Sequence, residues 1–140
     1  MKKAIALILA MLLTTLVFVS CVTKEPLSQK QVAGHYMHKY GEWESFGDHF
    51  SIDLNADGTY SYYETYISSH IGMGNYSIHG DVITLTDELP GVDGTVTRFY
   101  RFRYVDDKLV FLAEKSGSFT YVDLPDGTVF DRYELSDFHE

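Results

Sequence analysis

The stretch from His49 to Tyr66, HFSIDLNADGTYSYYETY, decides the fold class of this chain. Phe50, Ile52 and Leu54 alternate with polar residues, the turn NADG (55–58) follows, and aromatic and β-branched residues resume after the glycine. Alternation with a period of two is typical of a β-strand, and Asn, Asp and Gly favour a tight turn between two strands. The stretch therefore predicts a β-hairpin.

The same stretch also fits the calcium-loop template D-x-[DN]-x-[DN]-G-x5-E, from Asp53 to Glu64. Such a loop needs a helix on each side to present its ligands, whereas both flanks here are strand-like. In a strand that leaves the turn, Glu64 lies about 20 Å beyond Gly58, too far to return as a bidentate ligand. We interpret the motif mainly as a hairpin turn. The alternative is a partial metal site at Asp53, Asn55 and Asp57.

Alternation continues through most of the chain beyond residue 32. Within residues 95–105, Tyr100 and Phe102 fall on one face and Arg101 and Arg103 on the other. Short strands separated by tight turns are typical of an antiparallel barrel or sandwich. We expect strands at residues 35–40, 49–54, 59–66, 75–78, 82–86, 95–105, 108–113, 119–124 and 128–133, after at most a short helical lead-in at 27–32. The predicted fold class is all-β, an antiparallel up-and-down meander of eight or nine strands that closes into a barrel.

The chain begins with MKKAIALILAMLLTTLVFVSC (residues 1–21), in which Lys2 and Lys3 precede an uncharged apolar stretch. This layout is typical of a secretory signal and is too short for a comfortable membrane span. Its last four residues, FVSC, resemble the lipobox of bacterial lipoproteins, which implies that Cys21 is acylated and begins the mature chain. Cys21 is the only cysteine, so an internal disulfide is excluded. An uncleaved anchor, or a chance cysteine beside an ordinary cleavage site, is the alternative.

The sequence divides into a signal peptide (1–20), a lipidated cysteine with a flexible linker (21–31), one barrel domain (32–134) and an acidic tail (135–140). The whole chain has 11 basic and 20 acidic residues. Without the two lysines of the signal, the mature chain has a formal charge of −11. Such a charge repels phosphate backbones, so we expect no nucleic-acid partner. The resemblance to bacterial lipoproteins implies a location in the cell envelope and, since Val22 is not aspartate, on the outer membrane where the organism has one.

Two further groups of residues suggest ligands. His35, Met37 and His38 are side chains that suit copper, although on a strand His38 faces away from the other two. The basic residues Arg98, Arg101 and Arg103 are expected to point outward and pair with acids; the alternative is that they face the barrel mouth and fix an anionic headgroup.

No pattern in the sequence supports a catalytic site. The sequence Ser68-Ser69-His70 lacks the strand–elbow–helix setting of a nucleophilic serine. Asp87 and Glu88 are adjacent, which on a strand sends their side chains to opposite faces. We expect no enzyme and no cofactor.

Several segments together resemble the small lipocalin-like β-barrel domains of bacterial lipoproteins, over residues 33–132. These segments are GHY (34–36), DGTYSYYE (57–64), SSHIGMGNYSI (68–78), GDVITLTD (80–87) and DKLVFLAEKSGSFTYVDLPDG (107–127). The resemblance implies a lipocalin-like fold and a place in the envelope, but no mechanism.

The function expected from these observations is non-catalytic binding of a small amphipathic ligand by a lipid-anchored, extracytoplasmic domain. One alternative is a protein-interaction or inhibitor module with a filled barrel and an exposed aromatic patch around Tyr62, Tyr63 and Tyr66. A second alternative is calcium or copper binding. The identity of the ligand or envelope partner stays open at this point.

Overall fold

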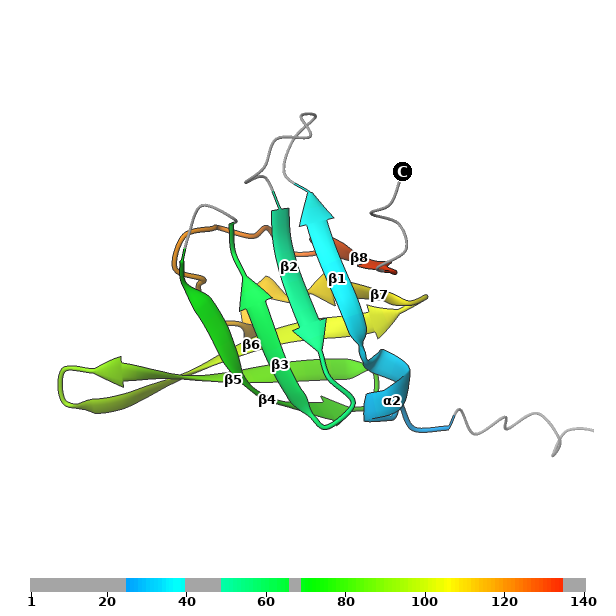
Figure 1. Cartoon of the computed structure of the whole chain (residues 1–140), viewed down its shortest axis with the longest axis horizontal. Coiled ribbons are helices and arrows are strands. Elements are labelled where there is room, and N and C mark those ends of the chain that lie inside the picture. The colour runs from blue at the N-terminus through cyan, green and yellow to red at the C-terminus, as the bar shows by residue number, and fades with distance from the viewer. Residues whose placement is uncertain (1–24, 40–48, 66–68, 135–140) are drawn as a thin grey trace, which may run out of the picture.

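The computed structural model describes residues 25–39, 49–65 and 69–134, which form a closed antiparallel β-barrel (Figure 1). Each strand pairs with the next in sequence, and the first strand pairs with the last. The elements are α2 (Gln29–Val32), β1 (Gly34–Lys39), β2 (His49–Leu54), β3 (Thr59–Tyr63), β4 (Ile71–His79), β5 (Val82–Gly91), β6 (Gly94–Val105), β7 (Lys108–Phe111), the 3-10 turn η2 (Ala113–Lys115) and β8 (Val129–Tyr133). The predicted all-β meander with barrel closure is confirmed, with eight strands. In the described part of the chain, no helix has the length and apolar character needed to cross a membrane.

The opening hairpin is formed by β2 and β3, which pair from Ser51↔Tyr63 to Leu54↔Tyr60. Gly58 adopts a φ of +87°, a left-handed conformation that side chains disfavour, and its N–H donates to Asn55 O at 3.1 Å. The alternation read from the sequence places the even-numbered residues of this hairpin inside the barrel, where Tyr60 and Tyr62 are buried. The hairpin prediction is therefore confirmed.

One predicted strand, at residues 119–124, is wrong. The chain between β7 and β8 (residues 112–128, hereafter the connection) contains η2 but no strand. The backbone N–H groups of Thr120, Tyr121 and Val122 donate to the side chain of Glu64 rather than to a neighbouring strand. The aromatic and β-branched residues of the connection cover the barrel. Because the same residue types are common in strands, the sequence predicted a strand here.

The boundaries of other elements also differ from the prediction. β4 begins four residues earlier than expected, at Ile71, and β5 continues to Gly91. The helical lead-in is present as α2, which closes one end of the barrel. Val32 is fully buried there, and Tyr36 Oη donates to its carbonyl at 2.6 Å. Tyr76 Oη closes the same end by donating to Asn55 O at 2.7 Å.

The barrel interior is filled mainly by aromatic and aliphatic side chains. The buried core consists of Val32, Tyr36, Phe50, Ile52, Leu54, Tyr60, Tyr62, Tyr76, Ile83, Leu85, Tyr100, Phe102, Leu109, Phe111, Phe119, Leu124 and Phe130. Large rings of this kind fill a small barrel of eight strands with side chains rather than leaving an open lumen. The described core therefore has the packed character expected of the filled-barrel alternative.

Two glycines of β4 make room for two of these rings. Gly72 lies opposite Tyr62 and Gly74 opposite Tyr60. A Cβ on Gly72 would lie 2.1 Å from Cε1 and Cζ of Tyr62, and a Cβ on Gly74 would lie 2.4 Å from the carbonyl oxygen of Thr86. Gly72 is thus required because the Tyr62 ring lies across it, and Gly74 because the backbone of β5 approaches it closely.

Burial sets the expected alkaline behaviour of the domain. It raises the pKa of Tyr36, Tyr60 and Tyr62 well above the usual value, and Asp87 raises the pKa of the last two further. The folded state therefore keeps these protons at a pH where the unfolded chain loses them. The resulting stabilisation is complete below the unfolded-state pKa of about 10 and is lost as the pH rises beyond it.

We therefore expect these three tyrosines to ionise only as the domain unfolds in alkali, in one cooperative step. Phenolate absorbance and far-ultraviolet circular dichroism, followed together against pH, would measure it. Tyr62→Phe should remove one of the late-ionising groups. Smooth ionisation of all tyrosines before any loss of β-structure would contradict the prediction.

Candidate functional site

Phe119, from the connection, occupies the end of the barrel opposite α2. Its ring stacks on Tyr100, with centroids 4.1 Å apart and planes at 8°. Phe50 and Tyr62 contact it edge-on at 4.8 and 5.4 Å, and Phe111 lies at 5.6 Å. We call these four surrounding rings the aromatic cage. Because Phe119 belongs to a loop, the group that fills the cage is separate from the hydrogen-bonded wall of the barrel.

Glu64 holds the connection in this position. Its side chain is fully buried, at 0% exposure, directly after β3. One carboxylate oxygen accepts the N–H of Thr120 at 3.0 Å, and the other accepts those of Tyr121 and Val122 at 2.5 and 3.1 Å. A carboxylate that accepts three backbone donors is well satisfied despite its burial. Glu64 thus fastens the segment that carries Phe119 to the barrel wall.

A second buried carboxyl group lies inside the barrel wall. Asp87 is 3% exposed and accepts a hydrogen bond from Tyr62 Oη at 3.1 Å. The Tyr60 ring stacks parallel to that of Tyr62 at 6.2 Å, and its buried hydroxyl has no hydrogen-bond partner among the described residues. A buried polar atom without a partner is unusual. The wall beside the aromatic cage is therefore polar, with unused hydrogen-bonding capacity.

Hollows lie on two sides of Phe119. The larger, of about 460 Å³, is lined by Arg98, Phe119 and the neighbouring residues Gly117, Ser118 and Thr120. The smaller, of about 150 Å³, lies under the connection and reaches Phe111 and Leu124. The covered end of the barrel, which we call the mouth, thus combines an occupied aromatic cage with adjacent space.

The three arginines of the basic cluster are separated by the fold. Arg103 points outward and forms an ion pair with Asp81 at 3.5 Å, and Arg101 donates to the Lys115 carbonyl. Arg98 instead lies at the mouth, where its Nη1 is 3.5 Å from Ser118 O. The expected outward pairing with an acid is confirmed for Arg103, whereas Arg98 lies at the barrel mouth, as the alternative predicted.

The residues of the calcium-loop motif are held by hydrogen bonds within the protein. Asp53 Oδ1 lies 2.6 Å from His35 Nδ1, and Asn55 Nδ2 donates to Thr59 Oγ1 at 3.0 Å. Asp57 Oδ1 accepts hydrogen bonds from the Thr59 hydroxyl at 2.6 Å and from the Thr59 N–H at 2.9 Å, and these two bonds lower the pKa of the Asp57 carboxyl. Glu64 lies at the other end of β3, against the connection. Calcium binding at the three candidate residues stays a prediction.

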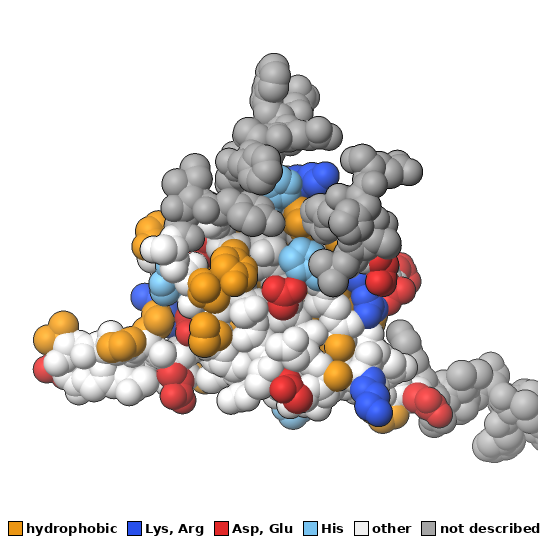
Figure 2. Space-filling model, viewed as in Figure 1, with side chains coloured by type: hydrophobic (Ala, Val, Ile, Leu, Met, Phe, Trp, Pro, Cys, Tyr) orange, Lys and Arg blue, Asp and Glu red, His pale blue; other side chains and the backbone are white. Residues whose placement is uncertain are grey.

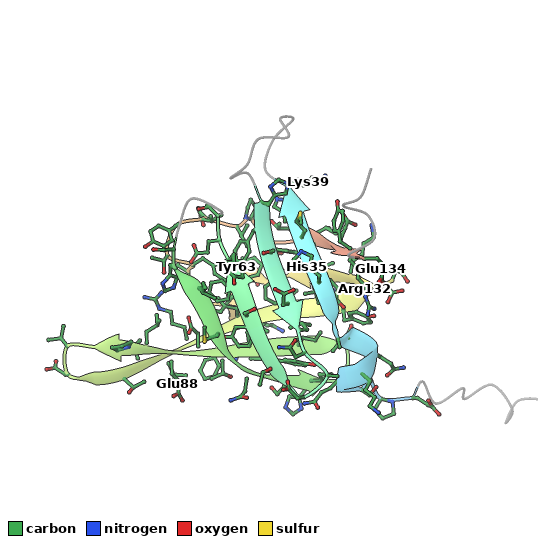
Figure 3. The ribbon with its side chains drawn as sticks, in the orientation of Figure 1. His35, Lys39, Tyr63, Glu88, Arg132 and Glu134 are labelled. Carbon is green, nitrogen blue, oxygen red and sulfur yellow. The ribbon has the colours of Figure 1, made fainter. Side chains whose placement is uncertain are left out.

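The candidate copper ligands do not converge. His35 faces outward beside Asp53, as Figure 3 shows, whereas the His38 ring packs 5.6 Å from Phe130 on the inner side. Met37 is 3% exposed. Within the ranges that the structure describes, no group of three or more His, Cys, Asp or Glu side chains is placed to hold a metal ion. Copper binding also stays a prediction.

The expected aromatic surface patch is wrong in one of its three members. Tyr62 is fully buried and faces the interior. Tyr63 lies on the outer side of β3, where Figure 3 shows it, opposite Ile71 of β4. Tyr66 lies outside the described residues, as do Cys21 and the Ser68 of the serine–histidine motif. Asp87 and Glu88 do occupy opposite faces, since Glu88 is exposed.

Sequence reasoning missed Glu64 and Asp87 as members of the site, although a signal was present. Glu64 continues the inward-facing series of Tyr60 and Tyr62, and Asp87 continues that of Ile83 and Leu85. A charged residue in phase with a buried face is seldom accommodated without a specific partner. The phase of each acid therefore predicts an internal role. Phe119 carried no comparable signal.

Comparisons with protein-family models, with curated proteins and with solved structures found no match to this chain. Its function is therefore inferred from the mouth, from the sequence of the N-terminal segment and from the surface of the barrel.

Proposed function

We propose that this chain is a non-catalytic, lipid-anchored binding protein that takes a small amphipathic ligand at the mouth of a lipocalin-like barrel. One observation carries the proposal: the aromatic cage is occupied by Phe119, a side chain from a connection that contributes no strand to the barrel wall. A ligand ring can replace the Phe119 ring without breaking any strand pairing. The filled interior then represents the closed state of the site.

The chemistry of the mouth defines the ligand class. Phe50, Tyr62, Tyr100 and Phe111 offer faces and edges to a flat apolar group, as they do to Phe119. Arg98, at the rim, offers a guanidinium that suits a carboxylate, sulfonate or phosphate. The preferred ligand therefore has a planar apolar part and one anionic group, and is small enough to fit the cage and the adjoining hollow.

Attachment to a membrane is supported by the N-terminal sequence. The segment FVSC (18–21) provides the cysteine that we propose is acylated. More than one acyl chain is needed for stable anchoring, and the acidic mature chain adds no attraction to anionic lipid. The domain would be held in the envelope by the lipid alone, outside the cytoplasm.

Anilinonaphthalene sulfonate, a planar fluorophore with one anionic group, tests the site. The parent chain should bind it weakly because Phe119 competes for the cage. Phe119→Ala should bind it about ten-fold more tightly, since a site that is closed most of the time loses apparent affinity in proportion. The double variant Phe119→Ala/Arg98→Gln should bind the fluorophore about ten-fold more weakly than Phe119→Ala alone, because it loses one ion pair in a partly dry site.

Tyr121→Ala is the matched control, because Tyr121 lies two residues from Phe119 on the same connection but is 60% exposed. It should bind the fluorophore as the parent does. All variants must keep the far-ultraviolet circular dichroism of the parent and a cooperative thermal transition, since the fluorophore also binds loosened proteins. Equal binding by Phe119→Ala and Tyr121→Ala would overturn the proposed site.

A further inference from the structure

The hairpin of β5 and β6 extends well beyond the barrel wall (Figure 1). β4 pairs with β5 only as far as Thr86, whereas β5 and β6 continue to pair as far as Gly91↔Gly94. β7 pairs with β6 only from Phe102 onward. Residues 88–97, from the pair Glu88↔Thr97 outward, therefore form a two-stranded arm, with neither edge covered by another strand of the described chain. Two strands alone are marginally stable in water, so such an arm gains from a third.

The β6 edge of this arm continues an edge that is used elsewhere in the molecule. Gly117 N donates to Phe99 O at 2.8 Å, Arg101 N donates to Ser116 Oγ at 2.8 Å, and Leu112 N donates to Arg101 O at 2.9 Å. Backbone groups in an antiparallel strand alternate between its two sides. Thr95 and Thr97 therefore direct their N–H and C=O groups to the same side as Phe99 and Arg101, where the connection no longer covers them.

The β5 edge of the arm is protected by its sequence. By the same alternation, Glu88 and Pro90 direct their backbone groups away from β6. Pro90 has no N–H to offer, and Glu88 places a charge on this edge, as Figure 3 shows. Proline and charge on an edge strand are features that prevent pairing with other chains. The β6 edge lacks both between Gly94 and Thr97, where Thr-Val-Thr (95–97) favours a strand.

The side chains of the arm indicate what kind of strand would fit. Val96 is 49% exposed and Val92 fully exposed, and Figure 2 shows hydrophobic side chains on the arm. Glu88 and Asp93 are exposed acids, and the mature chain carries a net charge of −11. A segment with β-branched residues would cover Val96, and lysine or arginine at alternate positions would match the charge.

We propose that the β6 edge of the arm, from Gly94 to Thr97, is the docking site for an extended basic segment of another polypeptide, which adds to the arm as a third strand. Main-chain hydrogen bonds to Thr95 and Thr97 supply the affinity, and the acidic arm selects a basic partner. This interaction surface is independent of the mouth and of its ligand.

The experiment uses the full chain in a neutral detergent and a fluorescein-labelled peptide of alternating lysine and valine. Fluorescence anisotropy should show saturable binding by the parent chain. Thr97→Pro removes an N–H from the open edge while leaving the β5–β6 hydrogen bonds intact, and should weaken binding about ten-fold. Thr97→Val, which keeps the N–H and the branched side chain, should bind as the parent does. A glutamate–valine peptide should not bind.

Each alternative result overturns the proposal. Equal binding by Thr97→Pro and Thr97→Val would mean that the acidic surface attracts the peptide without strand addition. If Thr97→Pro loses its native circular dichroism, amide exchange of the parent chain is measured instead. The Thr95 and Thr97 amides should become protected when the peptide binds. Unchanged exchange at these two amides would refute the site. Saturable self-association of the parent, lost in Thr97→Pro, would assign the edge to a second copy of this chain instead.

Discussion

Glu64→Leu is expected to lower the free energy of unfolding by about 3 kcal/mol, because it removes the buried carboxylate that accepts three part-buried backbone N–H groups of the connection. In a domain of about one hundred residues this corresponds to a fall in melting temperature of at least about 12 °C. Urea unfolding followed by circular dichroism would measure the loss directly.

Glu88→Leu is the matched control, since Glu88 is an exposed glutamate on the outer side of β5. Its effect should stay within about 0.5 kcal/mol. The amides of Thr120, Tyr121 and Val122 should exchange faster in Glu64→Leu, while those of β2 and β3 lose less protection. If the two leucine variants were equally stable, Glu64 would have no part in holding the connection.

Gly72→Ala is expected to cost about 3 kcal/mol, at the upper end of the usual effect of overpacking. The new methyl group would lie 2.1 Å from two atoms of the Tyr62 ring. Tyr62 cannot move aside easily, because it is fully buried, hydrogen-bonded to Asp87 and in contact with Phe119. Thermal unfolding of the variant and the parent would give the difference.

A smaller residue at position 62 provides the control for this clash. Gly72→Ala should cost little in a Tyr62→Leu background, so that the two substitutions are strongly non-additive. Gly117→Ala should be nearly neutral, because its nearest neighbour would be 3.7 Å from the new Cβ and its φ is not in the left-handed region. Additive effects of the first pair would show that the alanine methyl is accommodated elsewhere.

The strands could be predicted because apolar and polar residues alternate along them, and this alternation fixes which face of each strand is buried. Phe50, Ile52 and Leu54 could share a buried face only in a strand, and NADG (55–58) could then only be a turn. The connection escaped prediction because SFTYVDL (118–124) has strand-like composition. Its backbone donors bind an acid 56 or more residues away, a pairing that no local pattern reports.

The mouth was foreseen only in part. The sequence suggested Arg98 as one member of a cluster, although its phase with Tyr100 and Phe102 already separates it from Arg101 and Arg103. The length of the arm depends on where β4 stops pairing with β5, at Asn75, and where β7 stops pairing with β6, at Phe111. Local preference determines elements well; the edge left uncovered is a property of the whole sheet.

The closure of one barrel end by α2 bears on how the molecule would stand on a membrane. α2 begins at Gln29, only eight residues after Cys21, beside the end of β2, whereas Phe119 packs on Phe50 near the start of β2. With the proposed acyl group on Cys21, the plugged end would rest toward the bilayer and the mouth would open toward the aqueous phase. A ligand would therefore be collected from water or from a soluble carrier, rather than drawn directly out of the lipid to which the protein is attached.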